Sequence, residues 1–425
     1  MEERIPRVLT IAGSDSGGGA GIQADLKTFA SLGVFGMSAI TSITAQNTVE
    51  VRSVFDLPPD MIRDQIRAVI EDIGVDAAKT GMLHTEKIIS TVAEELEKHR
   101  FPVVVDPVMI AKSGARLLLE DAMDALMEKM IPRATVLTPN RHEAEALSGM
   151  RIENLEDAGR AAEKIAELGA EAVLVKGGHM PDQNMVVDVL FTDGCFKTYS
   201  AEFIRTDTDH GTGCTFSSAI AAELAKGKPI EEAVETAKQF ITKAIRSGLR
   251  LGEGHGPTNP MAWLQDGAEK YIVLENLRRA IELLESNMNA FRLVPEVKMN
   301  LVMALPHASD PSEVAGIPGR IVRVRERVKA SSCPQFGASK HLAGAILTVM
   351  QVDAGFRSIM NIRYTAHAVE ACRNLGLEIS SYDRRTEPEK VKEMEGGTIP
   401  WGTRTAIEKL GKVPDAIYHL GDWGK

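Results

Sequence analysis

Apolar runs of strand length alternate with amphipathic stretches of helix length through the first part of the chain. The expected strands cover residues 8–12, 103–105, 135–137 and 172–175, and the expected helices include residues 85–99, 156–168 and 230–247. A helix between two strands returns the chain to the end of the sheet where the first strand began, so such strands pair in parallel. The alternation therefore predicts an α/β fold, with a mostly parallel sheet and helices on both of its faces.

The chain is long enough for two domains, and its pattern changes near residue 265. Its 425 residues exceed the usual size of a single domain. Residues 252–260 are rich in glycine and proline, and a helical pattern returns over residues 268–291. We therefore expect one domain over residues 1–265 and a second α/β domain over residues 266–425.

The acidic excess of the chain lies entirely in its first part. Lys and Arg number 27 against 39 Asp and Glu in residues 1–265, and 22 against 20 in residues 266–425. Nucleic acids bind basic surfaces, so we expect no nucleic-acid partner. No apolar run is long enough to cross a bilayer, and the acidic N-terminus does not resemble a signal peptide. We therefore expect a cytoplasmic protein with no membrane partner.

The cysteines of the chain are few and widely separated. There are four of them, Cys195, Cys214, Cys333 and Cys372, and none forms a C-x-x-C pair. This spacing argues against a zinc site and against a disulfide framework. We expect all four to be free thiols.

A glycine-containing turn directly precedes an apolar helix at residues 210–216, which read His-Gly-Thr-Gly-Cys-Thr-Phe. Glycines at a helix N-terminus allow backbone N–H groups to converge on one point, where the helix dipole adds positive charge. Such a point suits a phosphoryl group in transfer. The alternative is a tight turn that holds a buried, inert cysteine.

Polar or glycine-rich clusters follow several expected strands. They cover residues 13–25, 45–48, 79–83, 106–109, 138–143 and 176–179. Parallel strands end at one edge of a sheet, where α/β proteins bind their ligands. Each cluster alone is also compatible with an ordinary turn. The cluster at 13–25 is neither a Walker A loop nor a dinucleotide-binding fingerprint.

Taken together, these clusters resemble those of the hydroxymethylpyrimidine/phosphomethylpyrimidine kinases of thiamine biosynthesis. The resemblance extends over about residues 5–263, with motifs at residues 11–15, 19–27, 45–48, 81–83, 105–109, 138–140, 176–179 and 210–215. It implies a ribokinase-like fold and two ATP-dependent phosphorylations of 4-amino-5-hydroxymethyl-2-methylpyrimidine, first to the monophosphate and then to the diphosphate. It also implies Mg²⁺, small-molecule substrates and a homo-oligomeric assembly.

The resemblance assigns the pyrimidine to residues of the early clusters. Gln46 can offer both a donor and an acceptor to an aminopyrimidine edge, as the matching glutamine of the family does. Asp25 and the backbone of Gly13 are expected to hold the hydroxymethyl end of the substrate. Met82 is expected to supply an apolar wall.

The phosphates and the metal ion are assigned to the later clusters. Lys176 is expected to bind the nucleotide phosphates, and Asn140 to contribute to the same nucleotide site. Asp106 and Glu143, with Asn140, offer oxygen ligands of the kind that hold Mg²⁺ through its waters. The backbone amides from Gly211 through Gly213 to Cys214 are expected to form the anion hole for the transferred phosphoryl group.

Cys214 stands where sugar kinases of the wider ribokinase-like group have an aspartate base. We expect it to act as a base on the acceptor hydroxyl, with its pKa lowered by the helix N-terminus and nearby cations. The second phosphorylation needs no base, because its acceptor is already an anionic phosphate. Some pyridoxal kinases share this cysteine, so pyridoxal stays open as a second substrate.

The second domain contains a dense basic stretch followed by a loop of small residues. Charged and apolar residues alternate over 320–329, which predicts one strand with its charge on one face. The loop ends in Lys340 and His341. It could bind a diphosphate, with Arg320 forked on its oxygens, His341 donating as negative charge builds and Lys340 in support. The alternative is a solvated charged surface.

This half resembles the ThiN-type thiamine-phosphate synthase domain, which is often fused behind such a kinase. The resemblance covers about residues 270–425, with motifs at residues 317–321, 336–343, 360–364 and 417–425. It implies condensation of the pyrimidine diphosphate with hydroxyethylthiazole phosphate, which yields thiamine phosphate and diphosphate. The alternative is a regulatory module that senses thiamine phosphate, because related domains lie behind DNA-binding helices in other proteins. The sequence contains no basic helix-turn-helix candidate.

Overall fold

The computed structural model describes residues 4–110, 117–178, 184–394 and 396–421. The chain forms two compact units, Met1–Leu264 and Gln265–Lys425, and passes from one to the other within helix α9 (Ala262–Ser286). This helix begins at Ala262, before the predicted residue 268. Two parts of the sequence motifs, His179 and the tail after Gly421, lie outside the described residues.

The described part of the first unit contains a nine-stranded sheet. Its strands, in spatial order, are β3 (Val51–Asp56), β2 (Phe35–Gln46), β1 (Arg7–Asp15), β4 (Ala77–Thr80), β5 (Val103–Val105), β6 (Val136–Leu137), β7 (Ala172–Val175), β8 (Met185–Thr192) and β9 (Cys195–Glu202). The strands from β2 to β7 pair in parallel, and β3, β8 and β9 pair antiparallel at the two edges. The predicted fold class is confirmed.

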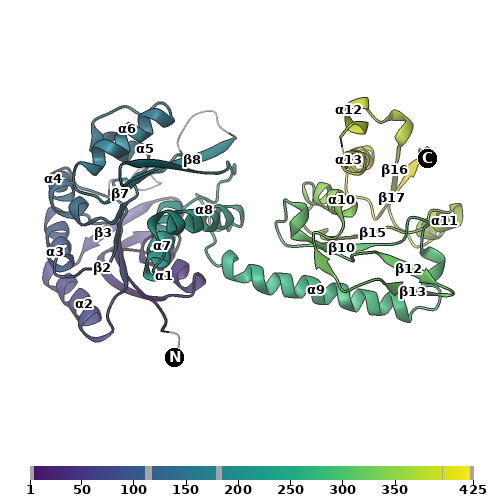
Figure 1. Cartoon of the computed structure of the whole chain (residues 1–425), viewed down its shortest axis with the longest axis horizontal. Coiled ribbons are helices and arrows are strands. Elements are labelled where there is room, and N and C mark those ends of the chain that lie inside the picture. Colours follow the sequence, from purple (N-terminus) through teal and green to yellow (C-terminus); the bar gives the residue numbers. More distant parts are fainter. Residues whose placement is uncertain (1–3, 111–116, 179–183, 395, 422–425) are drawn as a thin grey trace. The chain divides into compact units, whose positions relative to one another are not determined.

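Helices cover both faces of this sheet (Figure 1). One face carries α2 (Pro59–Asp72), α3 (Glu86–Leu96), α5 (Arg141–Ser148) and α6 (Leu155–Ala166), and the other carries α1 (Gly21–Ser31), α7 (Thr212–Ala225) and α8 (Ile230–Arg246). Val103 and Val105 pack toward the first set of helices, and Val104 packs toward the second. Burial on both faces explains why these strands read as continuous apolar runs in the sequence.

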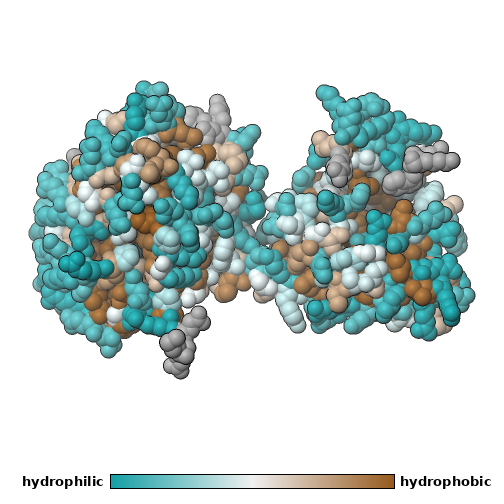
Figure 2. Space-filling view, viewed as in Figure 1, coloured by the Kyte–Doolittle hydropathy of each residue, from teal (hydrophilic) through white to brown (hydrophobic). Residues whose placement is uncertain are grey.

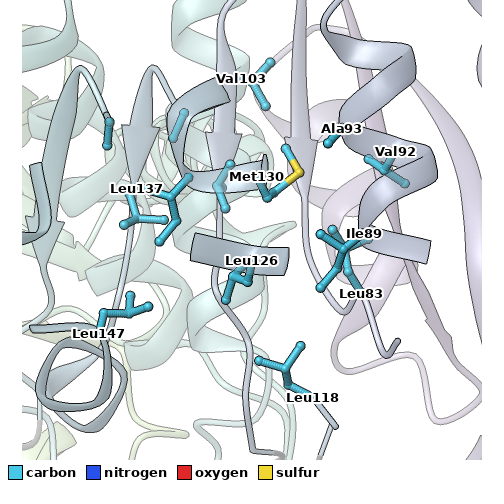
Figure 3. Packing of buried hydrophobic residues seen from close by; sticks show 14 of the residues in the cluster. Leu83, Ile89, Val92, Ala93, Val103, Leu118, Leu126, Met130, Leu137 and Leu147 are labelled. Atoms are coloured by element: carbon cyan, nitrogen blue, oxygen red, sulfur yellow. The ribbon is translucent and has the colours of Figure 1, made fainter. Parts of the chain in front are cut away.

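The first face holds the larger of the two layers of packed side chains, part of which Figure 3 shows. Ile89 and Val92 of α3, Leu137 of β6 and Met130 belong to the same buried cluster. The predicted helices over 85–99, 156–168 and 230–247 correspond to α3, α6 and α8, which end slightly earlier than predicted. The side chain of Thr85 accepts from the Ile88 amide and so defines the start of α3.

The second unit has a smaller, mainly antiparallel sheet. Its four strands, in spatial order, are β14 (Gln335–Phe336), β11 (Val314–Gly316), β10 (Leu301–Ala304) and β15 (Ser358–Met360). The other elements are α10 (Lys340–Met350), α11 (Ala366–Asn374), α12 (Glu389–Lys392), α13 (Thr398–Leu410) and the parallel pair β16 (Ile379–Asp383) and β17 (Ala416–Leu420). Val302 of β10, Ile346 of α10 and Ile407 of α13 share one buried cluster, so these two helices cover the sheet.

The basic stretch at 320–329 folds differently from the prediction of a single strand. It forms a hairpin of β12 (Ile321–Val324) and β13 (Arg327–Ala330), and Arg325 in the turn has a φ of 56°. A two-residue turn pairs odd-numbered with even-numbered residues, so Arg323 lies opposite Val328 and Val324 opposite Arg327. The basic side chains are therefore divided between the two faces of the hairpin. The predicted one-sided charge is wrong.

On the face shown in Figure 2, hydrophilic residues cover most of the surface of both units, with hydrophobic patches between them. Among the described helices, none has the length and apolar character needed to cross a membrane. All four cysteines are free, as predicted.

Candidate active site

The turn before α7 packs directly on the glycine-rich loop that follows β1. Gly211, the N-cap of α7, has a φ of 81°. A Cβ atom at this position would lie 1.8 Å from the carbonyl oxygen of Gly19. Both the positive φ and the backbone contact therefore require glycine at position 211. Gly211 offers no side-chain acceptor to cap the helix. The backbone N–H groups of the first helical turn can therefore donate to a ligand.

An ion pair borders this helix N-terminus. Lys176 Nζ lies 2.9 Å from Asp106 Oδ1, although 70 residues separate the two in the sequence. A Cβ atom on Gly213 would lie 3.5 Å from Asp106 Oδ2 and 3.5 Å from Lys176 Nζ. The structure therefore brings the predicted phosphate-binding lysine, one predicted metal ligand and the predicted anion hole together.

The charges of this pair depend on each other. Burial disfavours the charged form of Lys176, but Asp106 and Glu143 outweigh burial and raise its pKa. Asp106 also accepts weak hydrogen bonds from the hydroxyls of Thr138 at 3.3 Å and Ser217 at 3.3 Å. Lys176 is therefore charged at neutral pH, and its side chain is mostly buried beside Asp106.

Glu143 and Asn140 form a capping box at the start of α5. The Asn140 side chain accepts from the Glu143 amide at 3.0 Å, and a Glu143 oxygen accepts from the Asn140 amide at 2.7 Å. Burial raises the pKa of Glu143 to about 7, with Asp106 adding to the rise and Lys176 opposing it. Asn140 also forms a β-bridge with Lys176. Both predicted nucleotide-site residues are thus adjacent.

The predicted metal ligands do not by themselves form a complete coordination shell. Across the described ranges, no group of three or more histidine, cysteine, aspartate or glutamate side chains is placed to hold a metal ion. Asp106 and Glu143 nevertheless repel each other electrostatically. Two carboxylates in a poorly solvated site fit a hard divalent cation that keeps several waters, as Mg²⁺ does.

Cys214 does not have the lowered pKa that the sequence suggests. Burial raises the pKa of its thiol to about 11, and the charges of Asp25 and Asp106 add to the rise. Lys79 and the backbone amide of Gly21 act in the opposite direction but do not compensate. The helix N-terminus and the nearby cation are therefore weaker than burial and the two carboxylates, and the thiol is protonated at neutral pH.

Asp25 lies beneath the site, which differs from its expected place against the substrate. It is fully buried, and its two oxygens accept from Lys79 at 2.9 and 3.0 Å. Thr10 at 2.6 Å and Ser218 at 2.7 Å donate to the same carboxylate. These donors occupy both carboxylate oxygens, so Asp25 joins α1, β1, β4 and α7.

Gln46 lies at the end of β2 in a polar network with His210. Its Nε2 is 3.4 Å from His210 Nε2, which is in turn 3.1 Å from Asp15 Oδ2. Asp15 accepts from the amides of Gly17, Gly19 and Ala20 at 2.8 to 3.0 Å, so it shapes the glycine-rich loop. The network thus links the predicted pyrimidine-binding amide to the turn before α7.

Gly13 and Met82, the other predicted substrate contacts, lie next to each other. A Cβ atom on Gly13 would lie 3.1 Å from Met82 Sδ, and Thr41 Oγ1 donates to the Met82 carbonyl at 2.9 Å. Gly13 lies near the end of β1, and Met82 follows the neighbouring strand β4. The structure therefore brings two further expected residues to the same edge of the sheet.

Four residues of this region had no role assigned from the sequence, namely Asp15, Lys79, His210 and Ser218. Asp15, Lys79 and His210 lie inside the clusters that were recognised, and Ser218 is one helical turn after Cys214. The available signal was membership of these clusters, which Ser218, inside α7, does not share. The ion pair of Lys79 with Asp25, the bond of Ser218 to Asp25 and the contact of His210 with Asp15 join residues 54 to 195 positions apart, so these contacts could not be derived from local spacing.

The predicted residues of the second unit lie near separate turns. Arg320 has a φ of 72° and donates to the carbonyl of Val297. Lys340 and His341 begin α10 and are exposed. Within the described part of the chain, no hydrogen bond or ion pair joins Arg320 to either of them. The N-cap of α10, Ser339, makes no side-chain capping bond, so the first-turn amides of this helix are also accessible to a ligand.

Comparison with known proteins divides the chain in the same way. Residues 15–259 match the family model of phosphomethylpyrimidine kinase, and residues 276–425 match that of thiamine-phosphate synthase ThiN. The hydroxymethylpyrimidine/phosphomethylpyrimidine kinase of Bacillus subtilis is 50% identical over 260 residues, which are 61% of this chain and 96% of that protein. The thiamine biosynthesis bifunctional protein ThiED of Geobacter sulfurreducens is 49% identical over 260 residues, 61% of this chain and 53% of that protein.

Solved structures resemble the first unit. A pyridoxal kinase of Bacillus subtilis in complex with ADP has a TM-score of 0.57 and 44% sequence identity, and the match covers 61% of this chain and 98% of that one. The phosphomethylpyrimidine kinase of Clostridium difficile has a TM-score of 0.51 and 48% identity, over 57% of this chain and 100% of that one. Both similarities are high enough to compare site residues as well as fold.

Proposed function

The chain belongs to the phosphomethylpyrimidine kinase family over residues 15–259 and to the thiamine-phosphate synthase ThiN family over residues 276–425, and from this premise we propose that it makes thiamine phosphate. Its first unit phosphorylates 4-amino-5-hydroxymethyl-2-methylpyrimidine twice at the expense of ATP. Its second unit joins the resulting diphosphate to hydroxyethylthiazole phosphate and releases diphosphate. The substrates are small molecules, and the protein acts as a homo-oligomer.

One observation carries the kinase assignment. The uncapped N-terminus of α7 lies beside the Lys176–Asp106 ion pair, with Gly213 next to both charges. Phosphoryl transfer requires a place where negative charge on the transferred group meets backbone N–H groups and a cation. Solved relatives with ADP or AMP-PCP support ATP as the donor.

One set of residues in the first unit binds the nucleotide and the transferred phosphoryl group, and another set binds the pyrimidine. The amides of Gly211, Gly213 and Cys214 bind the transferred phosphoryl group, and Lys176 binds the nucleotide phosphates together with Asn140. Gln46 pairs with the aminopyrimidine edge, and Met82 and the Gly13 backbone border the ring. Asp25 acts from below by joining α1 to α7 through Ser218 and to β4 through Lys79.

Asp106 and Glu143 would hold Mg²⁺, mostly through its waters. When bound, this ion neutralises charge on the phosphates during transfer. Burial, with a smaller contribution from Asp106, raises the pKa of Glu143, and a bound cation would favour its charged form. Asp106 keeps its hydrogen bonds to Thr138 and Ser217, which orient the carboxylate toward the site.

Loss of the acceptor hydroxyl proton does not require an ionised Cys214, because this proton leaves late and passes to an oxygen of the transferred phosphoryl group or to water. Phosphoryl transfer has a loose transition state in which positioning and electrostatics supply most of the rate acceleration. The thiol, with a pKa of about 11, therefore acts mainly as a packed wall next to the anion hole. This replaces the role of base that the sequence suggested for Cys214.

In the second unit, Arg320 and His341 stabilise the departing diphosphate, with Lys340 in support. Departure of diphosphate leaves a cation that the aminopyrimidine ring delocalises, so the thiazole nitrogen attacks late. Fixed cationic donors on the leaving oxygens then lower the barrier. The exposed N-terminus of α10 supports this assignment, because it offers amides beside Lys340 and His341.

A one-pot assay tests the proposal. The full chain is incubated with the hydroxymethylpyrimidine, MgATP and hydroxyethylthiazole phosphate, and thiamine phosphate is measured. Accumulation of thiamine phosphate is expected, and absence of both pyrimidine phosphates and thiamine phosphate would refute the proposal. The full chain supplied with pyrimidine diphosphate and thiazole phosphate, without ATP, separates a synthase from a sensing module, because a module would bind thiamine phosphate without forming it.

The similarity to pyridoxal kinases supports pyridoxal as a second candidate acceptor. Pyridoxal also carries a hydroxymethyl group on a six-membered nitrogen ring. A competition assay with both acceptors distinguishes the two substrates through their kcat/KM values. We expect the pyrimidine to be preferred, and a higher kcat/KM for pyridoxal would reverse the assignment.

A further inference from the structure

A buried ion pair lies behind the turn that follows β7. Asp188 of β8 is 2% exposed and Lys238 of α8 is 8% exposed, and Lys238 Nζ donates to Asp188 Oδ2 at 2.7 Å. The other carboxylate oxygen, Oδ1, accepts the backbone N–H of Gly177 at 2.9 Å. Gly177 directly follows Lys176, so the ion pair is connected to the residue next to the phosphate-binding lysine.

The turn has little room to move against β8. A Cβ atom on Gly177 would lie 1.9 Å from the carbonyl oxygen of Val187, so the two backbones are in direct contact. On the other side, the backbone N–H of Lys176 donates to the carbonyl of Pro139 at 2.9 Å. The backbone of Lys176 is thereby held from two sides, and its side chain reaches Asp106.

The pair is suited to fix this backbone because a charged acceptor binds an N–H group more strongly than a neutral one. A buried carboxylate without a cation is costly. Lys238 supplies the cation to Oδ2 and leaves Oδ1 to accept from the Gly177 amide. Neither residue belongs to the clusters that the sequence singled out.

We propose that Asp188 and Lys238 are positioning residues that hold the Lys176–Gly177 turn in place for the phosphates of the nucleotide. The proposal rests on the proposed function, since it takes Lys176 to bind those phosphates. It assigns a role in nucleotide binding to the α8–β8 side of the sheet, which has no contact with the pyrimidine-binding amide of Gln46 in the described residues.

Two double variants of the full chain test this role. Asp188→Asn with Lys238→Met removes both charges but keeps an oxygen acceptor for the Gly177 amide. Asp188→Leu with Lys238→Met removes both charges and the acceptor. The variants are matched in charge and nearly in volume, so they differ mainly in the hydrogen bond to the turn.

The readouts are KM for MgATP, KM for the pyrimidine and kcat of the kinase reaction. Because displacement of a phosphate-binding group weakens binding, we expect the leucine variant to raise KM for MgATP roughly tenfold. We expect the asparagine variant to stay within about threefold of the wild type, and the pyrimidine KM to stay within about twofold in both. Equal KM values for MgATP in the two variants would overturn the proposal.

Lys238→Met alone provides a second comparison if the leucine variant does not fold. It leaves the Asp188 carboxylate without its cation, so we expect KM for MgATP to rise at least about threefold, with the pyrimidine KM unchanged. An unchanged KM for MgATP, or equal rises in both KM values, would also overturn the proposal.

Glu95→Gln serves as the control for general destabilisation. Glu95 is a buried carboxylate of α3 paired with Arg67 at 2.9 Å, and it lies on the opposite face of the sheet. The Glu95→Gln variant should have a lower midpoint of thermal unfolding, with unchanged KM values for MgATP and for the pyrimidine. A wild-type chain without kinase activity would refute the proposed function, whereas an active wild type with unaffected variants would refute only the positioning role.

Discussion

Replacement of Cys214 by alanine tests whether the thiol is a base or a wall of the site. With a pKa of about 11, about one thiol in a thousand is ionised at about pH 8. A well-placed general base contributes about 10²–10⁴-fold when it is in the reactive form. Multiplied by the ionised fraction, this leaves no more than about a tenfold contribution. We therefore expect Cys214→Ala to slow the first and the second phosphorylation by similar factors, at most about tenfold.

The assay measures initial rates separately from the alcohol and from the monophosphate, between about pH 7 and pH 9. The ionised fraction of a group with a pKa of about 11 rises tenfold per pH unit in this range. If Cys214 were the base, the alcohol reaction of the wild type would rise with the same slope, and alanine would abolish the rise. That result would refute our reasoning.

Cys195→Ala is the matched control for this experiment. Cys195 is a free, exposed cysteine at the start of β9. Its replacement should leave both rates and both pH profiles unchanged. A loss in this variant would show that thiol substitutions affect the protein by a route unrelated to the anion hole.

Three further predictions concern the other parts of the two sites. Gln46→Leu should weaken pyrimidine binding by about 2–4 kcal/mol, because the ligand loses its polar partner, and should leave nucleotide binding unchanged. Titration of both ligands measures this, and an unchanged pyrimidine affinity would refute the assignment of Gln46 to the pyrimidine. Arg320→Ala and His341→Ala should each slow thiamine phosphate formation by roughly 10²–10³-fold. The kinase steps should continue, so that pyrimidine diphosphate accumulates. Normal synthesis in either variant would show that the replaced residue is a solvated surface charge without a role in catalysis. Glu143 has a pKa of about 7 and binds a cation only when ionised. The Mg²⁺ concentration that gives half-maximal kinase activity should therefore fall as the pH rises through about 7. Glu143→Gln should remove this pH dependence, and an unchanged dependence would show that Glu143 is not a ligand.

The sequence predicted the architecture of the first unit because its signals are local. Strands such as β5 and β7 are buried on both faces and read as unbroken apolar runs, and α3, α6 and α8 show the helical period. Periodicity did not reveal a turn inside an alternating stretch, so the prediction failed there. The alternation over 320–329 fits one strand as well as it fits a hairpin until the turn at Arg325 is known.

The candidate site shows the same division between local and long-range information. The glycine pattern before an apolar helix was enough to select the turn at Gly211, whereas Gln46 and Lys176 were selected through the resemblance to the kinase family. Charge states were not accessible in this way. Burial and two carboxylates raise the pKa of Cys214, and neither is visible in the sequence around it.

Local sequence patterns thus indicated buried strands such as β5 and β7, helices such as α3, α6 and α8 and the turn at Gly211 that must contain glycine, since these follow from short-range sterics and periodicity. Only the tertiary structure decided that Asp25 is saturated by Lys79, Thr10 and Ser218, and that Asp188 holds the turn after Lys176. The partners of these carboxylates come from other strands and helices. Hydrogen bonds and electrostatic energies depend on distance and solvent exposure, and both are properties of the folded chain.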